Sequence, residues 1–382
     1  MMTTARPLRV LELRSVRGTG GGPEKTIIAG AALADRERIE VVVCYIRDAR
    51  DPVFQIDERA AQARVEYVEI VERHSFDTSV WSKLKQLIAD RRIDLLHAHE
   101  YKTDLLALLL SRSLGIPAVS TVHGWTGHSA RERYCYYPLD KRILARFPRL
   151  IAVSSEIAGE LQRHGADAGR ITTILNGIDP NVFRRCRDRE TAARGAIGAG
   201  PGDFVIGSVG RLEPQKRFDL LLEAFAEFRR GVPAARLVIA GDGSLRQALD
   251  AQRQRLQLAD SCTLVGHLTD VIGFHHALDQ FVQSSDYEGT PNSVLEAMAM
   301  ETPIVATEAG GTAELVHDGT HGRIVPIGRP DLLLASMRRS YAAAAESRAM
   351  ADAARRRVEH ELSFESRVRR VERIYLELAG RA

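Results

Sequence analysis

The sequence predicts an α/β protein built from two Rossmann-like, doubly wound domains with parallel sheets. Short apolar runs alternate with helical patterns along almost the whole chain, and this alternation is interrupted once, between Asn176 and Asp203, before it resumes. The chain has 382 residues. At roughly 100 to 200 residues per domain, this length fits two domains, each with a core of its own.

The first half of the chain contains a series of candidate strands. They are apolar on both faces, as expected of parallel strands that helices cover from both sides. In chain order they are Leu8–Leu13, Ile39–Ile46, Val65–Ile70, Ile93–His99, Pro117–His123 and Leu150–Ser155. We therefore expect an N-terminal domain over residues 1–180.

The next segment, residues 181–202, is polar and rich in turn-forming residues, which predicts a linker. Residues 203–362 then resume the alternation and are expected to form a second α/β domain. Its candidate strands are Phe204–Gly210, Arg236–Gly241, Cys262–Gly266, Gln280–Ser285, Pro303–Thr307 and Gly322–Pro326.

The tail is predicted to be helical, with one helix around Leu332–Glu359 and another over residues 363–382. The last helix carries an apolar stripe, so we expect it to pack back toward the N-terminal domain. The stripe consists of Phe364, Val368, Val371, Ile374, Tyr375 and Leu378. Ligands of such folds bind at the carboxyl ends of the strands, so we expect two sheets that face a cleft, with function in the strand-to-helix loops.

Composition excludes several classes of protein. Lys and Arg number 53 against 50 for Asp and Glu, and a net charge of +3 is too small to make nucleic acid the expected partner. The 4 cysteines form no Cys-x-x-Cys pair, so neither a zinc site nor a disulfide framework is indicated. The N-terminus lacks an apolar leader, and the longest apolar run, Leu105–Leu110, is far shorter than the roughly 18 residues of a membrane span. We expect a cytoplasmic location.

Arg211 and Lys216 follow the candidate strand Phe204–Gly210 and precede a helical pattern. Two such cations on a short loop can converge on one diphosphate, Arg as a two-pronged donor and Lys as a point charge. The alternative is a pair of solvated surface charges, since Lys and Arg are mostly exposed in proteins. The strand before the pair and the helix after it favour the diphosphate site.

The segment EGTPNSVLE, from Glu288 to Glu296, predicts a second part of the same site. Pro291 suits the first turn of a helix, and Gly289 lets a ligand approach the backbone closely. Backbone amides around Thr290 to Ser293 then make a ready anion site. One glutamate can reach a hydroxyl beside the phosphate, while the other binds a neighbouring diol. The alternative is a helix with a solvent-facing Glu and an Ala/Met core stripe.

The segments GRLEPQK, EGTPNSVLE and EAMAMETPIVATEAGGTAELV together resemble the nucleotide-sugar site of retaining glycosyltransferases of family 4, which have the two-domain GT-B fold. The resemblance implies that Arg211 and Lys216 bind the donor diphosphate. It also implies that Glu288 meets the transferred sugar and that Glu296 binds the ribose hydroxyls. The implied donor-binding backbone is Gly289, Thr290, Pro291, Asn292, Ser293 and Val294. One departure is a helix end, where the family often has Gly and this chain has Glu301 or Thr302.

A glycine-rich loop, GTGGGPEKT, follows the first candidate strand. It does not match the dinucleotide fingerprint G-x-G-x-x-G, because Pro23 occupies the position of the third glycine. The resemblance makes the N-terminal domain, residues 1–180, the acceptor side. It also assigns Gly21, Gly22 and Glu24 of this loop to the donor and acceptor cleft. The alternative is a tight turn that needs glycine.

His123 ends the candidate strand Pro117–His123. A lone histidine is more often a structural residue than a catalyst, because either ring nitrogen readily finds a backbone partner. The family has a histidine at this strand end near the sugar, and the resemblance therefore makes His123 a candidate catalytic residue.

Residues 131–149 contain six basic and two acidic side chains with aromatic residues between them. Such a segment suits an anionic membrane surface or a lipid-phosphate acceptor. The alternative is a solvated helix with aromatic contacts to the core. The first interpretation predicts peripheral contact with the inner face of the membrane.

The resemblance implies transfer of a hexose-type sugar, with retention, from a nucleotide-sugar donor to a glycan or lipid-linked acceptor in cell-surface polysaccharide synthesis. We favour a UDP-sugar. Cations and helix amides can stabilise the leaving diphosphate, so we expect neither a metal nor another cofactor. One alternative is a nucleotide-sugar epimerase or hydrolase of the same fold, which would form no stable glycoside. Another is a non-catalytic sugar-nucleotide-binding subunit, and the joint presence of Arg211, Lys216 and both glutamates argues against it.

Overall fold

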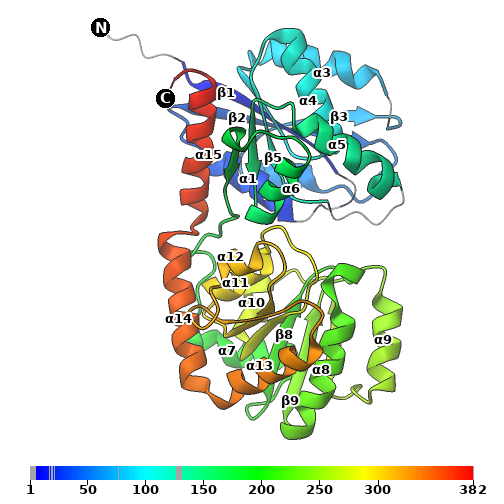
Figure 1. Cartoon of the computed structure of the whole chain (residues 1–382), viewed down its shortest axis with the longest axis vertical. Coiled ribbons are helices and arrows are strands. Elements are labelled where there is room, and N and C mark those ends of the chain that lie inside the picture. The colour runs from blue at the N-terminus through cyan, green and yellow to red at the C-terminus, as the bar shows by residue number, and fades with distance from the viewer. Residues whose placement is uncertain are drawn as a thin grey trace. The chain divides into compact units, whose positions relative to one another are not determined.

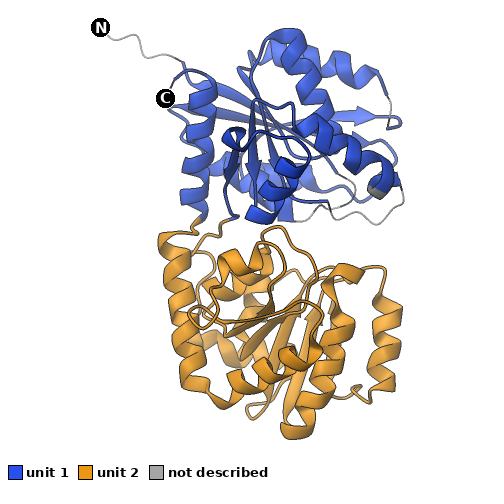
Figure 2. Cartoon of the chain, viewed as in Figure 1, with its two compact units in different colours: residues 1–176, 364–382 blue, residues 177–363 orange. Residues whose placement is uncertain are grey.

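The computed structural model describes residues 6–16, 18, 20, 22–75, 77–125 and 131–381. The chain divides into two compact units, drawn in different colours in Figure 2. Unit 1 comprises Met1–Asn176 and Phe364–Ala382, and unit 2 comprises Gly177–Ser363. Unit 1 is thus assembled from the two ends of the chain.

In unit 1, the described residues form a seven-stranded parallel sheet with the strand order β3-β2-β1-β4-β5-β6-β7. Its strands are β1 (Leu8–Ser15), β2 (Ile39–Asp48), β3 (Glu66–Glu72), β4 (Leu95–Ala98), β5 (Ala118–Val122), β6 (Arg149–Ala152) and β7 (Ile171–Thr173). Alternate residues of β1 enter different cores: Leu11 and Leu13 pack on one face of the sheet, and Leu8 and Val10 on the other. Burial on both faces explains why these strands read as continuous apolar runs.

Helices cover both faces of this sheet (Figure 1). They are α1 (Gly22–Leu33), α2 (Ile56–Gln62), α3 (Ser79–Asp90), α4 (Tyr101–Leu114), a π-helical turn η1 (Glu132–Tyr136), α5 (Tyr137–Leu144), α6 (Ser155–Arg163), a 3₁₀ turn η2 (Ala168–Arg170) and α15 (Phe364–Leu378). Glu100 caps α4, because its carboxylate accepts hydrogen bonds from the amides of Lys102 (3.1 Å) and Thr103 (3.0 Å). Because α4 is capped at Glu100, His99 is the one residue between the end of β4 and this cap.

The C-terminal helix α15 packs on the sheet of unit 1. Val371, Ile374 and Tyr375 are buried in the same core as Leu8 and Val10 of β1. The polar residues of α15 also meet the N-terminal half, since the carboxylate of Glu372 accepts a hydrogen bond from the amide of Asp35 at 2.7 Å. The predicted apolar stripe is therefore the face of α15 that covers the sheet.

In unit 2, a six-stranded parallel sheet has the order β10-β9-β8-β11-β12-β13 among the described residues. Its strands are β8 (Phe204–Val209), β9 (Ala235–Ala240), β10 (Cys262–Gly266), β11 (Gln280–Gln283), β12 (Ile304–Thr307) and β13 (Arg323–Val325). The helices are η3 (Arg187–Arg189), α7 (Glu190–Ala196), η4 (Pro214–Lys216), α8 (Phe218–Gly231), α9 (Arg246–Arg255), α10 (Val271–His276), α11 (Asn292–Ala299), α12 (Thr312–Leu315), α13 (Pro330–Ala342) and α14 (Ala344–His360).

The predicted class, an α/β protein with two doubly wound parallel sheets, is confirmed. Every candidate strand overlaps an observed one. The prediction lacked β7, because a run of three residues, Ile171–Thr173, carries almost no periodicity. It also expected one helix around Leu332–Glu359, which is wrong: Ala343 leaves the helical conformation, with φ −102° and ψ 55°, and separates α13 from α14. The surrounding alanines have no side-chain signal that marks this break.

The segment 181–202, expected to be a linker, belongs to unit 2 and contains α7, which contacts α10. Two arginines attach it: Arg185 donates to the carbonyl oxygen of Leu278 at 3.2 Å, and Arg194 pairs with Asp279 at 3.0 Å. These bonds join residues distant in sequence, so composition alone did not reveal them.

In each unit the strand order reverses beside the first strand, between β1 and β4 in unit 1 and between β8 and β11 in unit 2. Loops that leave neighbouring strands in opposite directions open a crevice at such a switch point, and ligands of doubly wound sheets bind there. Residues at the carboxyl ends of these four strands are therefore the first candidates for function.

Candidate active site

The loop after β8 places Arg211 and Lys216 at the switch point of unit 2. Glycines of the β9 loop press against it: a Cβ atom on Gly241 would lie 1.8 Å from the carbonyl oxygen of Gly210, and one on Gly243 would lie 2.6 Å from that of Leu212. Only residues without a side chain allow this approach. The loop backbone is therefore positioned by its neighbour as well as by β8.

Lys216 and Glu288 meet across the switch point. The Lys216 ammonium nitrogen lies 2.6 Å from Oε1 of Glu288, which is only 8% exposed. The same oxygen accepts hydrogen bonds from Ser285 Oγ (2.6 Å) and Gln283 Nε2 (3.1 Å). Three donors thus hold one buried carboxylate oxygen in place.

The two loops that meet here are also joined through their backbones. Ser284 donates its hydroxyl to the carbonyl oxygen of Lys216 at 2.8 Å, and the amide of Asp286 donates to that of Gln215 at 2.8 Å. The position of Lys216 relative to β11 is therefore set by the protein itself.

Arg211 differs from Lys216. Its side chain is exposed and makes no hydrogen bond or ion pair with any residue that the structure describes. A guanidinium without such a partner, five residues before Lys216 in the same loop, can bind a ligand without first breaking an internal hydrogen bond or ion pair.

The predicted helix after Glu288 is α11, with Pro291 as its N-terminal cap residue. The predicted backbone residues Gly289, Asn292 and Ser293 are half-buried, whereas Thr290, Pro291 and Val294 are buried. The amides of the first turn lie at the positive end of the helix dipole, an arrangement that favours anions. Val294 already donates its amide to the carbonyl oxygen of Pro291 at 3.2 Å.

Glu296 lies in the middle of α11 and is 6% exposed. Its carboxylate is 3.8 Å from Nε2 of the buried His275. The alternative considered above, a solvent-facing glutamate, does not hold for Glu296. At the end of the same helix, Glu301 adopts the left-handed conformation with φ 52°. This conformation explains why the family often has glycine at that helix end.

His123 and Gly22 belong to unit 1. Gly22 begins α1, whereas Gly21 lies outside the described residues. Glu24, which the resemblance assigns to the cleft, is 1% exposed, and its carboxylate pairs with Arg14 of β1. Arg14 also donates to the carbonyl oxygen of His99 at 2.8 Å, so this pair ties the glycine-rich loop to the end of β4.

His123 follows β5 and is half-buried. Its Nε2 lies 3.4 Å from Nδ1 of His99, and the two rings stack with centroids 5.6 Å apart. Burial lowers the pKa of His123 well below its ordinary value, with help from Arg14. The imidazole is therefore neutral near pH 7.

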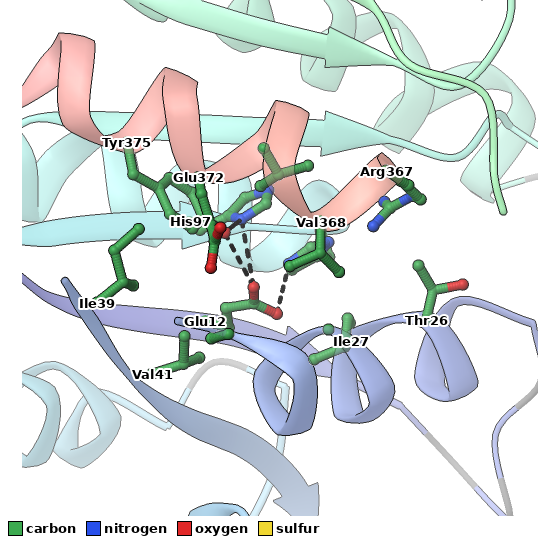
Figure 3. Close-up of a pocket in the computed structure, with 14 residues that line it drawn as sticks. Glu12, Thr26, Ile27, Ile39, Val41, His97, Arg367, Val368, Glu372 and Tyr375 are labelled. Carbon is green, nitrogen blue, oxygen red and sulfur yellow. Dashed lines mark hydrogen bonds and ion pairs between the residues drawn. The ribbon is translucent and has the colours of Figure 1, made fainter. Parts of the chain in front are cut away.

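Behind His99 lies a buried polar cluster at the switch point of unit 1, made of Glu12, His97, His99 and Tyr375. Figure 3 shows Glu12 on β1 pointing toward His97, with Tyr375 reaching in from α15. The Glu12 carboxylate lies 3.6 Å from His97 and 3.4 Å from His99. The two histidines beside it lower the pKa of Glu12 despite its burial. A cavity of about 20 Å³, enough for roughly one water, lies beside the cluster.

Within the described ranges, Glu12, His97 and His99 form a group that could hold a metal ion, since their ligand atoms lie within 4.8 Å of one another. Both ring nitrogens of His97 are already engaged, Nδ1 by Tyr375 at 2.5 Å and Nε2 by Thr121 at 2.7 Å. Ligation by His97 would have to break one of these bonds, so the cluster fits a hydrogen-bond network better than a metal site.

The basic and aromatic segment 131–149 is only partly on the surface. Phe147 is fully buried, and Tyr136 stacks on Tyr101 of α4 with centroids 5.3 Å apart. Tyr134 and Leu139 are 75% and 52% exposed. Aromatic core contacts and an exposed apolar surface thus occur in the same segment. Among the helices that the structure describes, none has the length and apolar character needed to cross a bilayer.

Sequence reasoning missed several residues of these clusters. Ser285 and Gln283, which hold Glu288, were interpreted only as strand residues. The pair His97-Ala98-His99 was included in a candidate strand and not singled out, although two histidines at alternate strand positions point to one face. The alternate spacing of the two histidines was the signal that the sequence offered. No sequence signal indicated that Tyr375 joins this cluster, because its position depends on where α15 packs.

The chain matches family models in both halves. Residues 20–182 match the model described as Glycosyltransferase Family 4, and residues 190–357 match Glycosyl transferases group 1. The EpsD glycosyltransferase of Bacillus subtilis (strain 168) is 30% identical over 271 residues, which cover 68% of this chain and 71% of that protein. A UDP-Gal:alpha-D-GlcNAc-diphosphoundecaprenol alpha-1,3-galactosyltransferase of Escherichia coli is 28% identical over 256 residues, covering 65% of this chain and 66% of that protein.

Among solved structures, HepE of Anabaena in complex with UDP superimposes with a TM-score of 0.84 at 20% identity, over 97% of this chain and 100% of HepE. Doubly wound folds with a ligand crevice at the switch point occur in many protein families. The family matches decide which of these families includes this chain. This chain belongs to glycosyltransferase family 4 and has the GT-B fold.

Proposed function

We propose that this glycosyltransferase moves a hexose-type sugar from a nucleotide-sugar donor, with a UDP-sugar favoured, to a glycan or lipid-linked acceptor in polysaccharide synthesis. We further propose that the anomeric configuration is retained and that no metal or other cofactor takes part. The observation that carries this proposal is the pairing of Lys216 with Glu288 at the switch point of unit 2, beside Arg211 and the start of α11.

The cations suit a leaving diphosphate. An ammonium group has three donors, and one of those on Lys216 is directed to Glu288, which leaves two for phosphate oxygens. Arg211 adds a planar pair of donors, and the α11 amides add partial positive charge. Donors placed in advance where charge develops contribute roughly 3 kcal/mol each to the transition state.

In the proposed reaction, the bond between the anomeric carbon and the diphosphate oxygen breaks, and a bond to the acceptor oxygen forms on the same face of the sugar. The acceptor hydroxyl proton passes to a phosphate oxygen of the leaving group. Glu288, held by Lys216, Gln283 and Ser285, places negative charge beside the carbon that becomes positive. Glu296, deeper in the unit, binds the ribose diol.

Relatives support the choice of donor and acceptor. HepE was solved with UDP and with UDP-glucose, and the Escherichia coli relative is named for a UDP-Gal donor and a diphosphoundecaprenol-linked acceptor. We propose a UDP-sugar and a lipid-linked or glycan acceptor here for the same reason. The exposed Tyr134 and Leu139, near the basic residues of segment 131–149, would then contact the inner face of an anionic membrane.

The first experiment measures thermal unfolding of the full chain with UDP, GDP or ADP. A ligand that binds the native state raises apparent stability by about 2.7 kcal/mol at one hundred times its Kd. We expect the largest rise with UDP. Equal, negligible shifts with all three nucleotides would contradict a nucleoside diphosphate site.

The second experiment identifies the product. Incubation with a radiolabelled UDP-sugar and a lipid-diphosphate glycan should yield a stable glycoside with the donor's anomeric configuration. Free sugar as the sole product would favour the hydrolase alternative. An epimerised nucleotide sugar would favour the epimerase, and nucleotide binding without any turnover across a panel of acceptors would favour the non-catalytic subunit.

A further inference from the structure

A continuous chain of polar contacts in unit 1 leads from Glu12, deep under α15, to His123 at the end of β5. Glu12 and His99 are 7% and 5% exposed, and the contact between Glu12 Oε2 and His99 Nε2 measures 3.4 Å. His99 Nδ1 in turn lies 3.4 Å from His123 Nε2. The family resemblance assigned no role to Glu12 or His99. His99 nevertheless contacts His123, the histidine assigned to the sugar, and Glu12 contacts His99.

The hydrogen bonds around Glu12, at the buried end of this series of contacts, determine which ring nitrogen of His97 carries a hydrogen. Tyr375 donates its hydroxyl to Oε1 of Glu12 at 3.0 Å, because an ionised carboxylate can only accept. The same hydroxyl oxygen must therefore accept from Nδ1–H of His97, 2.5 Å away. His97 Nε2 is then an acceptor for the hydroxyl of Thr121 at 2.7 Å. His97 is fully engaged in one tautomer.

Glu12 Oε2 and His99 Nε2 are both buried, and among the described residues neither makes a hydrogen bond of good geometry. They lie 3.4 Å apart, and a carboxylate oxygen attracts a ring N–H but repels a ring lone pair, so the hydrogen of His99 belongs on Nε2. The pKa of His99 is lowered to about 3 by burial, so its ring is neutral and its Nδ1 carries a lone pair. His123, facing that lone pair, must then carry its hydrogen on Nε2.

We propose that Glu12 and His99 are positioning residues that hold His123 in the Nε2–H tautomer, so that its Nδ1 accepts a hydrogen bond from a hydroxyl group of the bound sugar. The role of the sugar rests on the proposed function, whereas the tautomer follows from the contacts of unit 1 alone. His123 thereby selects a ligand that donates a hydrogen bond at this position. Arg367 of α15 lines the same small cavity as Glu12.

The direct test is nitrogen-15 NMR of the wild-type full chain labelled at histidine, at neutral pH and without substrate. Protonated and unprotonated ring nitrogens are distinguished by their chemical shifts, and the signals of His123 are identified by their loss in His123→Gln. We expect hydrogen on Nε2 of His123 and His99 and on Nδ1 of His97. An Nδ1–H tautomer or a doubly protonated ring at His123 would overturn the proposal.

Glu12→Gln tests whether the Glu12 carboxylate sets the tautomer of His123. As long as His97 keeps its hydrogen on Nδ1, which the same spectrum reports, the Tyr375 hydroxyl accepts from His97 and donates toward position 12. The amide oxygen of the variant then faces that hydroxyl, and the amide nitrogen donates to His99, whose hydrogen moves to Nδ1. His99 would then donate to His123, and His123 would carry hydrogen on Nδ1. We expect this double inversion in the folded variant. A folded Glu12→Gln protein in which both His97 and His123 keep their wild-type tautomers would remove Glu12 from the proposal.

Tyr375→Phe is the matched control. It disturbs the same buried cluster but leaves the contact between Glu12 Oε2 and His99 intact, so His123 should keep its Nε2–H tautomer. A structural role alone would make both variants less stable without inverting any tautomer. If Glu12→Gln does not fold, the wild-type spectrum and Tyr375→Phe still decide: inversion at His123 in the control would contradict the assignment. No step uses a sugar donor, so failure here is separate from failure of the transferase proposal.

Discussion

At the scale of single residues, Arg211 and Lys216 have different surroundings, although the sequence analysis assigned both to the donor diphosphate. Lys216 is paired with Glu288, and its side chain is 16% exposed, whereas the exposed side chain of Arg211 makes no hydrogen bond or ion pair with a described residue. A ligand that meets Arg211 adds an interaction, while one that meets Lys216 shares a cation already in use. Replacement of Lys216 therefore also affects the carboxylate.

We expect Arg211→Ala and Lys216→Ala each to lower turnover by about 10² or more, because each stabilises charge on the leaving diphosphate. Steady-state kinetics with a saturating donor provides the measurement. Arg230→Ala is the control, since Arg230 is an exposed arginine of the same unit. Near-normal activity in Arg211→Ala would remove that residue from the site.

The two glutamates should separate kinetically. Glu288→Gln keeps the shape but loses the negative charge beside the developing positive charge, so kcat should fall. Glu296→Ala should raise the donor KM, because the ribose is bound equally in ground and transition states, and Glu296→Gln should lose less. Kinetics with the two effects exchanged would show that the roles of Glu288 and Glu296 are reversed.

At the scale of elements, α4, β5 and α5 meet around a pair of buried carboxyl groups. Ser120 donates to Asp104 at 2.6 Å, and the Trp125 indole donates to Asp140 at 2.9 Å. Burial raises the pKa of Asp140 to about 6, and it raises that of Asp104 well above its ordinary value, with Asp140 adding to the effect. The packing of these elements therefore depends on a proton that the unfolded chain does not hold.

The sign of this dependence follows from proton binding. Above the ordinary range of an aspartate, the unfolded chain has released protons that the folded chain keeps, so the stability of unit 1 should fall as pH rises through about 6. Asp104→Asn keeps the acceptor for Ser120 and cannot ionise. We expect it to raise the unfolding temperature at pH 8 more than at pH 5.

This comparison is measured by tryptophan fluorescence, because the chain has 2 tryptophans, Trp81 and Trp125, and both lie in unit 1. Glu58→Gln, which neutralises an exposed carboxylate of the same unit, is the control. Stability curves for Asp104→Asn and wild type that run parallel across pH would contradict the assignment of the buried proton.

The helix α15 should contribute to the stability of unit 1 as strongly as the strands it covers. Ile374 is 4% exposed and packs in the core with Leu8 and Val10. We expect Ile374→Ala to cost about 2 to 5 kcal/mol, through lost burial and a residual cavity. Urea unfolding followed by tryptophan fluorescence tests this, with exposed Arg373→Ala as the control. Equal midpoints for the two variants would mean that α15 is not part of the core.

At the scale of the whole molecule, the proposed chemistry places all charge stabilisation on side chains and backbone amides. Transfer should therefore continue in excess EDTA, measured as product formed per unit time. The physical reason is that Arg211, Lys216 and the α11 amides already supply positive charge where the diphosphate leaves. Abolition by EDTA with recovery on adding magnesium or manganese would contradict metal-independent transfer.

Much of the fold and part of the candidate site could be predicted from local patterns. Apolar runs identified each longer strand, since burial on both faces leaves a continuous signature in sequence. Arg211, Lys216 and Glu288 were found because strand ends and helix starts are themselves local features. The break at Ala343 and the strand β7 were missed, because neither has a periodic pattern long enough to be detected.

The sequence by itself determined the α/β class, the alternation of elements and the residue types at the strand ends, because these depend on interactions between neighbours in the chain. Only the tertiary structure decided which strand ends and helices, and therefore which side chains, lie next to one another. Glu12 and Tyr375 are 363 positions apart, yet they share a hydrogen bond at 3.0 Å because α15 covers β1. Lys216 reaches Glu288 because the sheet places β8 beside β11. Such contacts follow from strand order and helix packing, which no local pattern encodes.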